Sequence, residues 1–126
     1  MREGIVGDWR RLLLMRNKII PALIASNQRK LDERFGKIRR LGSDLHLDVM
    51  DGKFVRNKSL LFNFKLPSGR KYSAHLLMQK PITWVHKNLR WMSEIIVHAE
   101  SEEFEKVIDY VKSKGKRIGV AINPET

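Results

Sequence analysis

A histidine and an aspartate, His46 and Asp48, lie two residues apart in the segment 45–52, whose sequence is LHLDVMDG. Side chains alternate between the two faces of a strand, so a strand over 45–51 would place both of them, together with Met50, on one face. The opposite face would then carry aliphatic side chains for a packed layer, namely Leu45, Leu47 and Val49. An imidazole nitrogen and a carboxylate oxygen on one face can share a divalent cation. The same pair could instead satisfy its polar atoms by hydrogen bonds to neighbouring residues.

The chain has 126 residues, of which 42% are hydrophobic, and it contains no cysteine. A chain of this length is in the single-domain range and can bury about two-thirds of the surface that its unfolded form exposes. No apolar run approaches the roughly 20 residues that a membrane span needs, and the N-terminus lacks the apolar core and cleavage site of a signal peptide. Without cysteine, a metal ion would have to be held by histidine and carboxylate side chains. We expect a cytoplasmic location and no association with a membrane.

The formal net charge of +11 favours contact with nucleic acids or other polyanions. The Lys and Arg residues are scattered, however, and the sequence has no zinc-finger spacing, no aromatic-rich strand typical of RNA-binding domains and no Gly-rich basic repeat. We therefore expect nonspecific polyanion binding and no dedicated nucleic-acid module. Residues 1–18 mix apolar side chains with Arg and Lys, and are predicted to form a basic amphipathic N-terminal extension that packs on the protein.

Segments typical of strands alternate with segments typical of helices along the rest of the chain. Five strands are expected, over residues 19–25, 45–51, 72–77, 94–99 and 117–123. The first helix can begin at Ser26 or Asn27 and end at Gly42, a second follows Pro81, and a third opens at Ser101. Repeated βα units predict an α/β fold with a parallel sheet and right-handed crossovers.

The number of these units indicates only part of a barrel. A complete eight-stranded TIM barrel takes about 250 residues, so residues 19–126 are predicted to form a partial TIM (β/α)8 barrel of about four βα units plus a fifth strand. After the second strand the sequence indicates a turn at Asp51 and Gly52, an irregular basic loop and a short apolar stretch, 60–66. The two expected domains are therefore the extension 1–18 and the partial barrel 19–126.

The segment 45–57, LHLDVMDGKFVRN, strongly resembles the signature of the ribulose-phosphate 3-epimerase family. Four further segments resemble other strands of that family in order and spacing: IPALIAS at 20–26, AHLLM at 74–78, IVHAE at 96–100 and GVAINPET at 119–126. The resemblance covers residues 19–126 and implies that this domain is part of a ribulose-phosphate-binding barrel.

The resemblance implies an isomerase of carbohydrate metabolism, in the pentose phosphate pathway, that interconverts ribulose 5-phosphate and xylulose 5-phosphate. The implied cofactor is one divalent metal ion of the zinc, iron, manganese or cobalt type. His46, Asp48 and His75 match the metal ligands of the family, and Asp48 also matches one of the two carboxylates that exchange the proton on opposite faces of carbon 3. Removal of that proton gives an enediolate, whose negative oxygen a metal ion can stabilise.

Three further residues, Met50, His98 and Asn123, match positions of the family that line the substrate. Met50 could equally be ordinary core filler, because its flexible thioether fills irregular gaps. His98 could be a core histidine whose hydrogen bonds are satisfied within the protein. His86 lies on an expected helix and is predicted to be a surface residue.

The sequence also departs from the family pattern. The second proton-transfer aspartate, which is also the fourth metal ligand of the family, belongs to the seventh strand, and the glycine-rich phosphate site belongs to the loops after strands six to eight. All of these lie beyond Thr126. Ala22 stands where the family usually has a serine that contacts the substrate, and Leu77 where a methionine is common. We therefore expect the chain alone to be inactive, and to act as an isomerase only with the missing half of the barrel present.

The expected partners are accordingly a sugar-phosphate substrate and either a second copy of the chain or another chain that completes the barrel. Two other functions remain open at this point. One is a catalytically dead half-barrel that serves as an assembly or interaction module. The other is a basic polyanion-binding protein built on the same scaffold.

Overall fold

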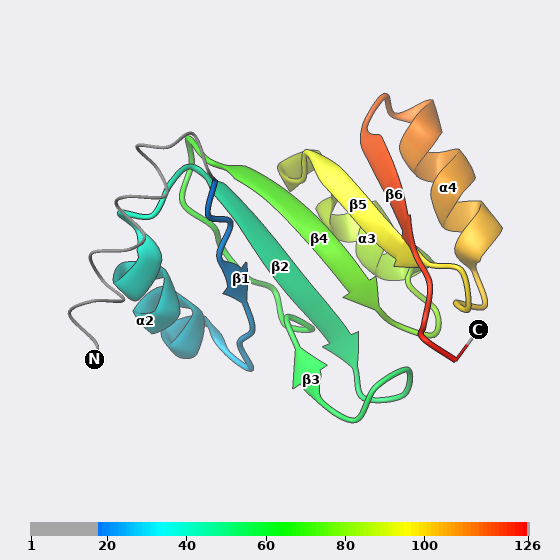
Figure 1. The fold of residues 1–126 in the computed structure, drawn as a ribbon, viewed down its shortest axis with the longest axis horizontal. Coiled ribbons are helices and arrows are strands. Elements are labelled where there is room, and N and C mark those ends of the chain that lie inside the picture. The colour runs from blue at the N-terminus through cyan, green and yellow to red at the C-terminus, as the bar shows by residue number, and fades with distance from the viewer. Residues whose placement is uncertain (1–17, 126) are drawn as a thin grey trace.

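The computed structural model of the protein describes residues 18–125, so most of the expected extension 1–18 lies outside the described residues. Five parallel strands form a sheet in the order β1-β2-β4-β5-β6, and the short strand β3 pairs antiparallel with β2 (Figure 1). Their bounds are Ala22–Leu23 for β1, Asp44–Asp51 for β2, Lys58–Ser59 for β3, Lys71–Leu77 for β4, Glu94–His98 for β5 and Arg117–Ala121 for β6. This order of neighbouring parallel strands confirms the predicted α/β fold of a partial TIM barrel.

Helices cover one face of the sheet, and Figure 1 shows α3 behind the strands and α4 beside β6. The described helices are α2 at Gln28–Ile38, α3 at Ile82–Asn88, the short 3-10 helix η1 at Leu89–Trp91 and α4 at Phe104–Ser113. Their apolar side chains form one core with the strands, and the helix residues buried in it include Leu31, Phe35, Trp84, Val85, Val107 and Val111. The strand residues of this core include Leu45, Leu47 and Val49, each no more than 1% exposed. The predicted aliphatic face of the second strand is therefore confirmed.

The helix starts show which polar side chains act as caps. The Asn27 side chain accepts a hydrogen bond of 2.9 Å from the backbone N–H of Lys30, so Asn27 is the cap of α2 among the two predicted candidates. The helix ends before Gly42, earlier than predicted. α4 begins at Phe104, later than predicted, and the hydroxyl of the buried Ser101 donates to the carbonyl of Gln79 at 3.1 Å instead of capping the helix.

The connection from β3 to β4 contains no helix between residues 60 and 70, all of which are described. Leu60 is fully buried, and its carbonyl accepts a hydrogen bond of 3.0 Å from the Trp84 indole. The partly buried side chains Phe62, Phe64 and Leu66 pack against the core. The predicted apolar stretch 60–66 thus covers the sheet in place of a helix, and the other three connections carry α2, α3 and α4.

The first strand is much shorter than the predicted range 19–25. Pro21 lies immediately before β1 and has no N–H to donate to a neighbouring strand, although its carbonyl accepts a hydrogen bond of 2.9 Å from the His46 backbone. β1 is also an edge strand that pairs with β2 alone. Few ladder hydrogen bonds are therefore formed at this edge of the sheet.

Within the described residues, β1 and β6 are the two edges of the sheet, each with one neighbouring strand. Exposed apolar side chains lie at or next to both edges: Ile20 is 51% exposed, Ile24 41%, Val120 51% and Ile122 63%. The sheet is thus an open segment of a barrel in the part of the chain that the structure describes. No helix between residues 18 and 125 has the length and apolar character needed to cross a membrane.

Candidate metal centre

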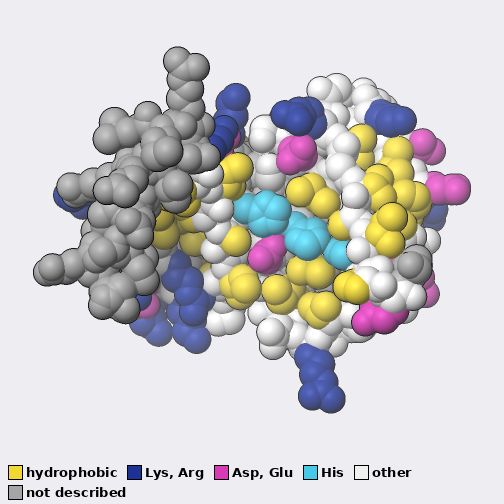
Figure 2. All heavy atoms as spheres, in the orientation of Figure 1, with side chains coloured by type: hydrophobic (Ala, Val, Ile, Leu, Met, Phe, Trp, Pro, Cys, Tyr) yellow, Lys and Arg dark blue, Asp and Glu magenta, His cyan; other side chains and the backbone are white. Residues whose placement is uncertain are grey.

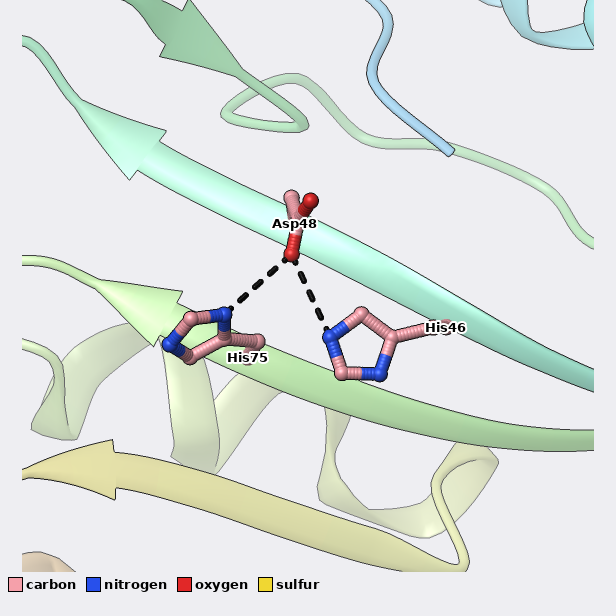
Figure 3. A group of neighbouring side chains, drawn as sticks. All are labelled: His46, Asp48 and His75. Atoms are coloured by element: carbon pink, nitrogen blue, oxygen red, sulfur yellow. Dashed lines mark hydrogen bonds and ion pairs between the residues drawn. The ribbon is translucent and has the colours of Figure 1, made fainter. Parts of the chain in front are cut away.

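Three side chains meet on the face of the sheet opposite the helices (Figure 3). His46 and Asp48 come from β2, and His75 comes from β4, where it pairs with Asp48 in the register of the two parallel strands. The strand alternation that buries the aliphatic residues of β2 toward the helices turns His46 and Asp48 to this open face. The three residues that match the family's metal ligands thus lie together, within the two strands rather than beyond their carboxyl ends.

The carboxylate of Asp48 is the point where the three side chains meet. Its Oδ1 atom lies 3.3 Å from His46 Nε2 and 3.3 Å from His75 Nδ1. The three ligand atoms all lie within 4.8 Å of one another. A tetrahedral zinc ion with bonds of about 2.0–2.1 Å would separate two of its ligand atoms by about 3.3 Å. The distance from Asp48 to each histidine nitrogen therefore fits a divalent cation held by two imidazole nitrogens and one carboxylate oxygen.

The three side chains are partly shielded from water but can still be reached, with exposures of 25% for His46, 19% for Asp48 and 24% for His75. Burial lowers the pKa of His75, and the neighbouring His98 lowers it further, whereas Asp48 acts in the opposite direction. The net lowering keeps the imidazole of His75 neutral near pH 7, which leaves a lone pair for a metal ion. The Asp48 carboxylate supplies negative charge to the same site.

His98 lies next to His75, on strand β5, which pairs with β4. Its Nε2 atom is 2.8 Å from Nε2 of His75, and the two rings stack with their centroids 4.9 Å apart. The ring of Phe54 also packs against His98, with the centroids 4.9 Å apart, and His98 is only 6% exposed. Its Nδ1 atom lies 3.6 Å from Oε1 of Glu100. His98 is thus a buried histidine that contacts the site through His75.

The other residues predicted to line the substrate are not part of the three-residue group. Met50 is 9% exposed and pairs with Ser59 of β3 and Leu77 of β4. Asn123 follows β6, and its backbone N–H donates to Oε2 of Glu100 at 3.1 Å. Their roles toward a substrate stay predictions. His86 is exposed on α3, as predicted, where its ring meets Tyr110.

Asp51 has a structural role that goes beyond the predicted turn. Its carboxylate accepts backbone N–H hydrogen bonds of 2.8 Å from Lys53, Phe54 and Gln79. Burial acts to raise the pKa of Asp51, but these hydrogen bonds outweigh it and hold the pKa below its ordinary value. The Gln79 carbonyl in turn accepts from the Ser101 hydroxyl, so the carboxyl ends of β2, β4 and β5 are tied together beside the site.

The open face has a histidine-rich centre with apolar surroundings. In Figure 2, histidine side chains lie in the middle of this face, hydrophobic side chains lie around them, and Lys and Arg are seen toward the margin. An apolar surrounding strengthens electrostatic interactions at a central charged group, because fewer water molecules screen it. The positive charge of the chain is therefore not concentrated at the candidate site on this face.

The fold and the site together define part of a β/α barrel that carries a candidate metal centre on its inner face. The chain belongs to the ribulose-phosphate 3-epimerase family, whose model matches residues 18–126. This match confirms the family resemblance over the whole partial barrel.

Individual relatives agree with this assignment. Proteins named ribulose-phosphate 3-epimerase from Encephalitozoon cuniculi and Schizosaccharomyces pombe are 27% and 28% identical to the chain, and each alignment covers 90% of it. The protein of the same name from Bacillus subtilis is 28% identical over 86% of the chain. These alignments cover 55%, 54% and 54% of the three relatives, so the chain spans about half the length of the curated relatives it matches.

Proposed function

We propose that the chain supplies the metal-binding half of a ribulose-phosphate 3-epimerase, which inverts carbon 3 of a ketopentose 5-phosphate and so interconverts ribulose 5-phosphate and xylulose 5-phosphate. The observation that carries the proposal is the convergence of His46, Asp48 and His75 at ligand distances on the inner face of the sheet. Membership of the family supports the choice of substrate.

We propose His46, Asp48 and His75 as the ligands of one divalent ion of the zinc, iron, manganese or cobalt type. A bound ion would act as a Lewis acid toward the ketone oxygen and so increase the acidity of the proton on carbon 3. The fit rests on the donor set, since two imidazole nitrogens and one carboxylate oxygen suit these ions, and the described sheet offers an approach from its open face.

Asp48 is proposed as the base that removes the proton from one face of carbon 3. Its carboxylate is partly shielded, which favours proton transfer over exchange with bulk water. Inversion needs a second acid on the opposite face, and none of the six described strands offers a counterpart of the family's seventh-strand aspartate. Met50 and Asn123 are proposed to line the substrate beside Asp48.

The missing groups require a partner for the described sheet. We propose that a second chain or a further part of the barrel covers the edges β1 and β6 and supplies the second acid and the phosphate site. The exposed apolar residues at these edges support this proposal. A cytoplasmic location is proposed with it, and one relative, from rice, is named as a cytoplasmic isoform.

The same exposed edges favour a second candidate function. A half-barrel without catalytic activity would use β1 and β6 as docking edges and serve as an assembly module, because unpaired strand edges readily pair with other chains. Activity measured on a completed barrel separates the two functions, since the assembly module predicts binding without turnover.

The test is complementation. The chain is produced together with the second half of the Schizosaccharomyces pombe epimerase, and the purified pair is assayed with ribulose 5-phosphate, a divalent metal ion and heavy water. We expect xylulose 5-phosphate to form with deuterium at carbon 3, and the substitution Asp48→Asn to abolish both, because an amide is neither a base nor an anionic ligand. A stable pair that shows no turnover and no deuterium exchange would contradict the proposed activity and favour the assembly module.

A further inference from the structure

The contact between His75 and His98 restricts where their protons can lie. Their Nε2 atoms are 2.8 Å apart, a distance that requires one proton between them, because two bare nitrogens repel and two N–H groups collide. A neutral imidazole carries a single N–H, so the proton at this contact also fixes the state of the other nitrogen in each ring. The protons of the two neutral rings can therefore be placed in only two ways.

In the first arrangement, His75 donates from Nε2 to His98. The Nδ1 atom of His75 is then bare and faces Oδ1 of Asp48, while Nδ1 of His98 carries the proton and faces Glu100. In the second arrangement, His98 donates from Nε2 to His75. His75 then carries its other proton on Nδ1 toward Asp48, and Nδ1 of His98 is bare. A metal ion can bind His75 at Nδ1 only in the first arrangement.

Glu100 favours the first arrangement. Its Oε1 atom lies 3.6 Å from Nδ1 of His98, whose side chain is only 7% exposed. A bare nitrogen that faces a carboxylate in such a shielded position is repelled, whereas an N–H in the same place is attracted. The other oxygen of Glu100 accepts the backbone N–H of Asn123 at 3.1 Å, which fixes the carboxylate to the chain after β6.

We propose that Glu100 and His98 are positioning residues of the metal centre, which set the proton of His75 on Nε2 and so present its bare Nδ1 as a metal ligand. This inference rests on the proposed metal centre. Asp48 has the opposite effect. With no cation beside it, Asp48 favours the second arrangement, because its carboxylate can accept a hydrogen bond from an N–H at Nδ1 of His75. A cation next to Asp48 removes that preference. Glu100 then sets the proton of His98 on Nδ1, and so makes His75 the donor in its hydrogen bond to His98. The hydrogen bond that His75 donates also increases the electron density on its ligand nitrogen.

Phe54 assists this arrangement by covering His98. Its ring lies 4.9 Å from the His98 ring, the same centroid distance as that between His98 and His75. The aromatic cover limits the access of water, which could otherwise donate or accept in place of Glu100 and remove its influence. Phe54, in the loop after β2, thus shields His98 from water. Asp51 fixes this loop, because its carboxylate accepts a hydrogen bond from the backbone N–H of Phe54.

The first measurement is zinc affinity of the 126-residue chain and its variants. We expect Glu100→Gln to weaken zinc binding about 10- to 100-fold, as removal of an outer hydrogen-bond partner of a metal-bound histidine typically does. The matched control is Glu102→Gln, which removes the same charge from a side chain that is 50% exposed and lies beside Lys80. His98→Phe should weaken binding, and His98→Gln should restore part of it, because an amide oxygen can accept the proton of His75.

The second measurement is the position of the protons on His75 and His98, read from nitrogen-15 NMR spectra of the imidazole rings. With zinc we expect N–H at Nε2 of His75 and at Nδ1 of His98. Without metal, Glu100→Gln should shift His98 toward the Nε2–H form relative to the wild-type chain. A merely structural role of Glu100 would lower thermal stability but would not move these protons.

The two measurements separate this inference from the proposed function. A wild-type chain that binds no zinc would contradict the proposed function, and the NMR comparison without metal would still decide the role of Glu100. Zinc affinity of Glu100→Gln equal to that of the wild type, or identical proton positions in both metal-free chains, would overturn the inference.

Discussion

His75 and Asp48 lie opposite each other in the register of β4 and β2, with His75 Nδ1 at 3.3 Å from Asp48 Oδ1. The next pair toward the N-terminus, Leu47 and Ala74, is fully buried on the helix side of the sheet. A slip of one residue would expose those apolar side chains and turn the polar pair into the core, so the register is strongly specified. The geometry of the candidate metal centre therefore follows from the hydrophobic pattern of two neighbouring strands.

The 126-residue chain alone should show little epimerase turnover. The described sheet provides one carboxylate for proton exchange, and loss of a general acid or base typically lowers the rate about 10² to 10⁴-fold. Conversion of ribulose 5-phosphate is measured with the chain and, as a reference, with the complete Schizosaccharomyces pombe epimerase under the same metal conditions. Comparable turnover by the isolated chain, at a concentration where it is monomeric, would show that the second acid is not needed.

The chain should self-associate through the edges of its sheet. Val120 and Ile122 are 51% and 63% exposed at the β6 edge, and burial of such side chains against another chain is favourable. Sedimentation velocity should show dimers or larger species, and Val120→Lys with Ile122→Lys should shift the population toward the monomer. Leu61→Lys, in a loop and 45% exposed, is the control and should leave the distribution unchanged. A wild-type monomer at high concentration, with cooperative unfolding and no binding of a hydrophobic dye, would refute this prediction.

Asp51 should make the stability of the chain depend on acid pH. Because backbone hydrogen bonds lower the pKa of Asp51 in the folded protein, its contribution is present above the ordinary carboxyl pKa of about 4 and is lost as the pH falls through the folded value. Asp51→Asn should lower the free energy of unfolding at pH 7 by about 1 to 2 kcal/mol and flatten its decline below about pH 4. Asp109→Asn, at an exposed position of α4, is the control. The curves are measured by urea denaturation at pH 7 and below about pH 4. Equal curves for Asp51→Asn and the wild type under both conditions would contradict the stabilising role of Asp51.

The strand pattern and the convergence of His46, Asp48 and His75 could be predicted because both follow from alternation along strands and from the family signature. The helix-free connection over 60–70 could not, since a short apolar run is compatible with either a helix or an irregular segment. The contacts of Asp51 depend on backbone N–H groups brought from β4, although an aspartate before a glycine at a strand end is a known turn signal. Glu100 stands two residues after His98, the same spacing as His46 and Asp48, and this repeated spacing was the available signal for its place beside the site.

Zinc binding to the 126-residue chain, measured by titration calorimetry, is the decisive test of the metal centre. We expect one ion per chain, and at least tenfold weaker binding for Asp48→Asn, because the substitution removes the only negative charge among the three proposed ligands. Asp44→Asn is the matched control, since Asp44 lies on the same strand and pairs with Lys18 rather than with the histidines. Zinc affinity that is unchanged in Asp48→Asn, or equally reduced in Asp44→Asn, would contradict a metal centre at His46, Asp48 and His75.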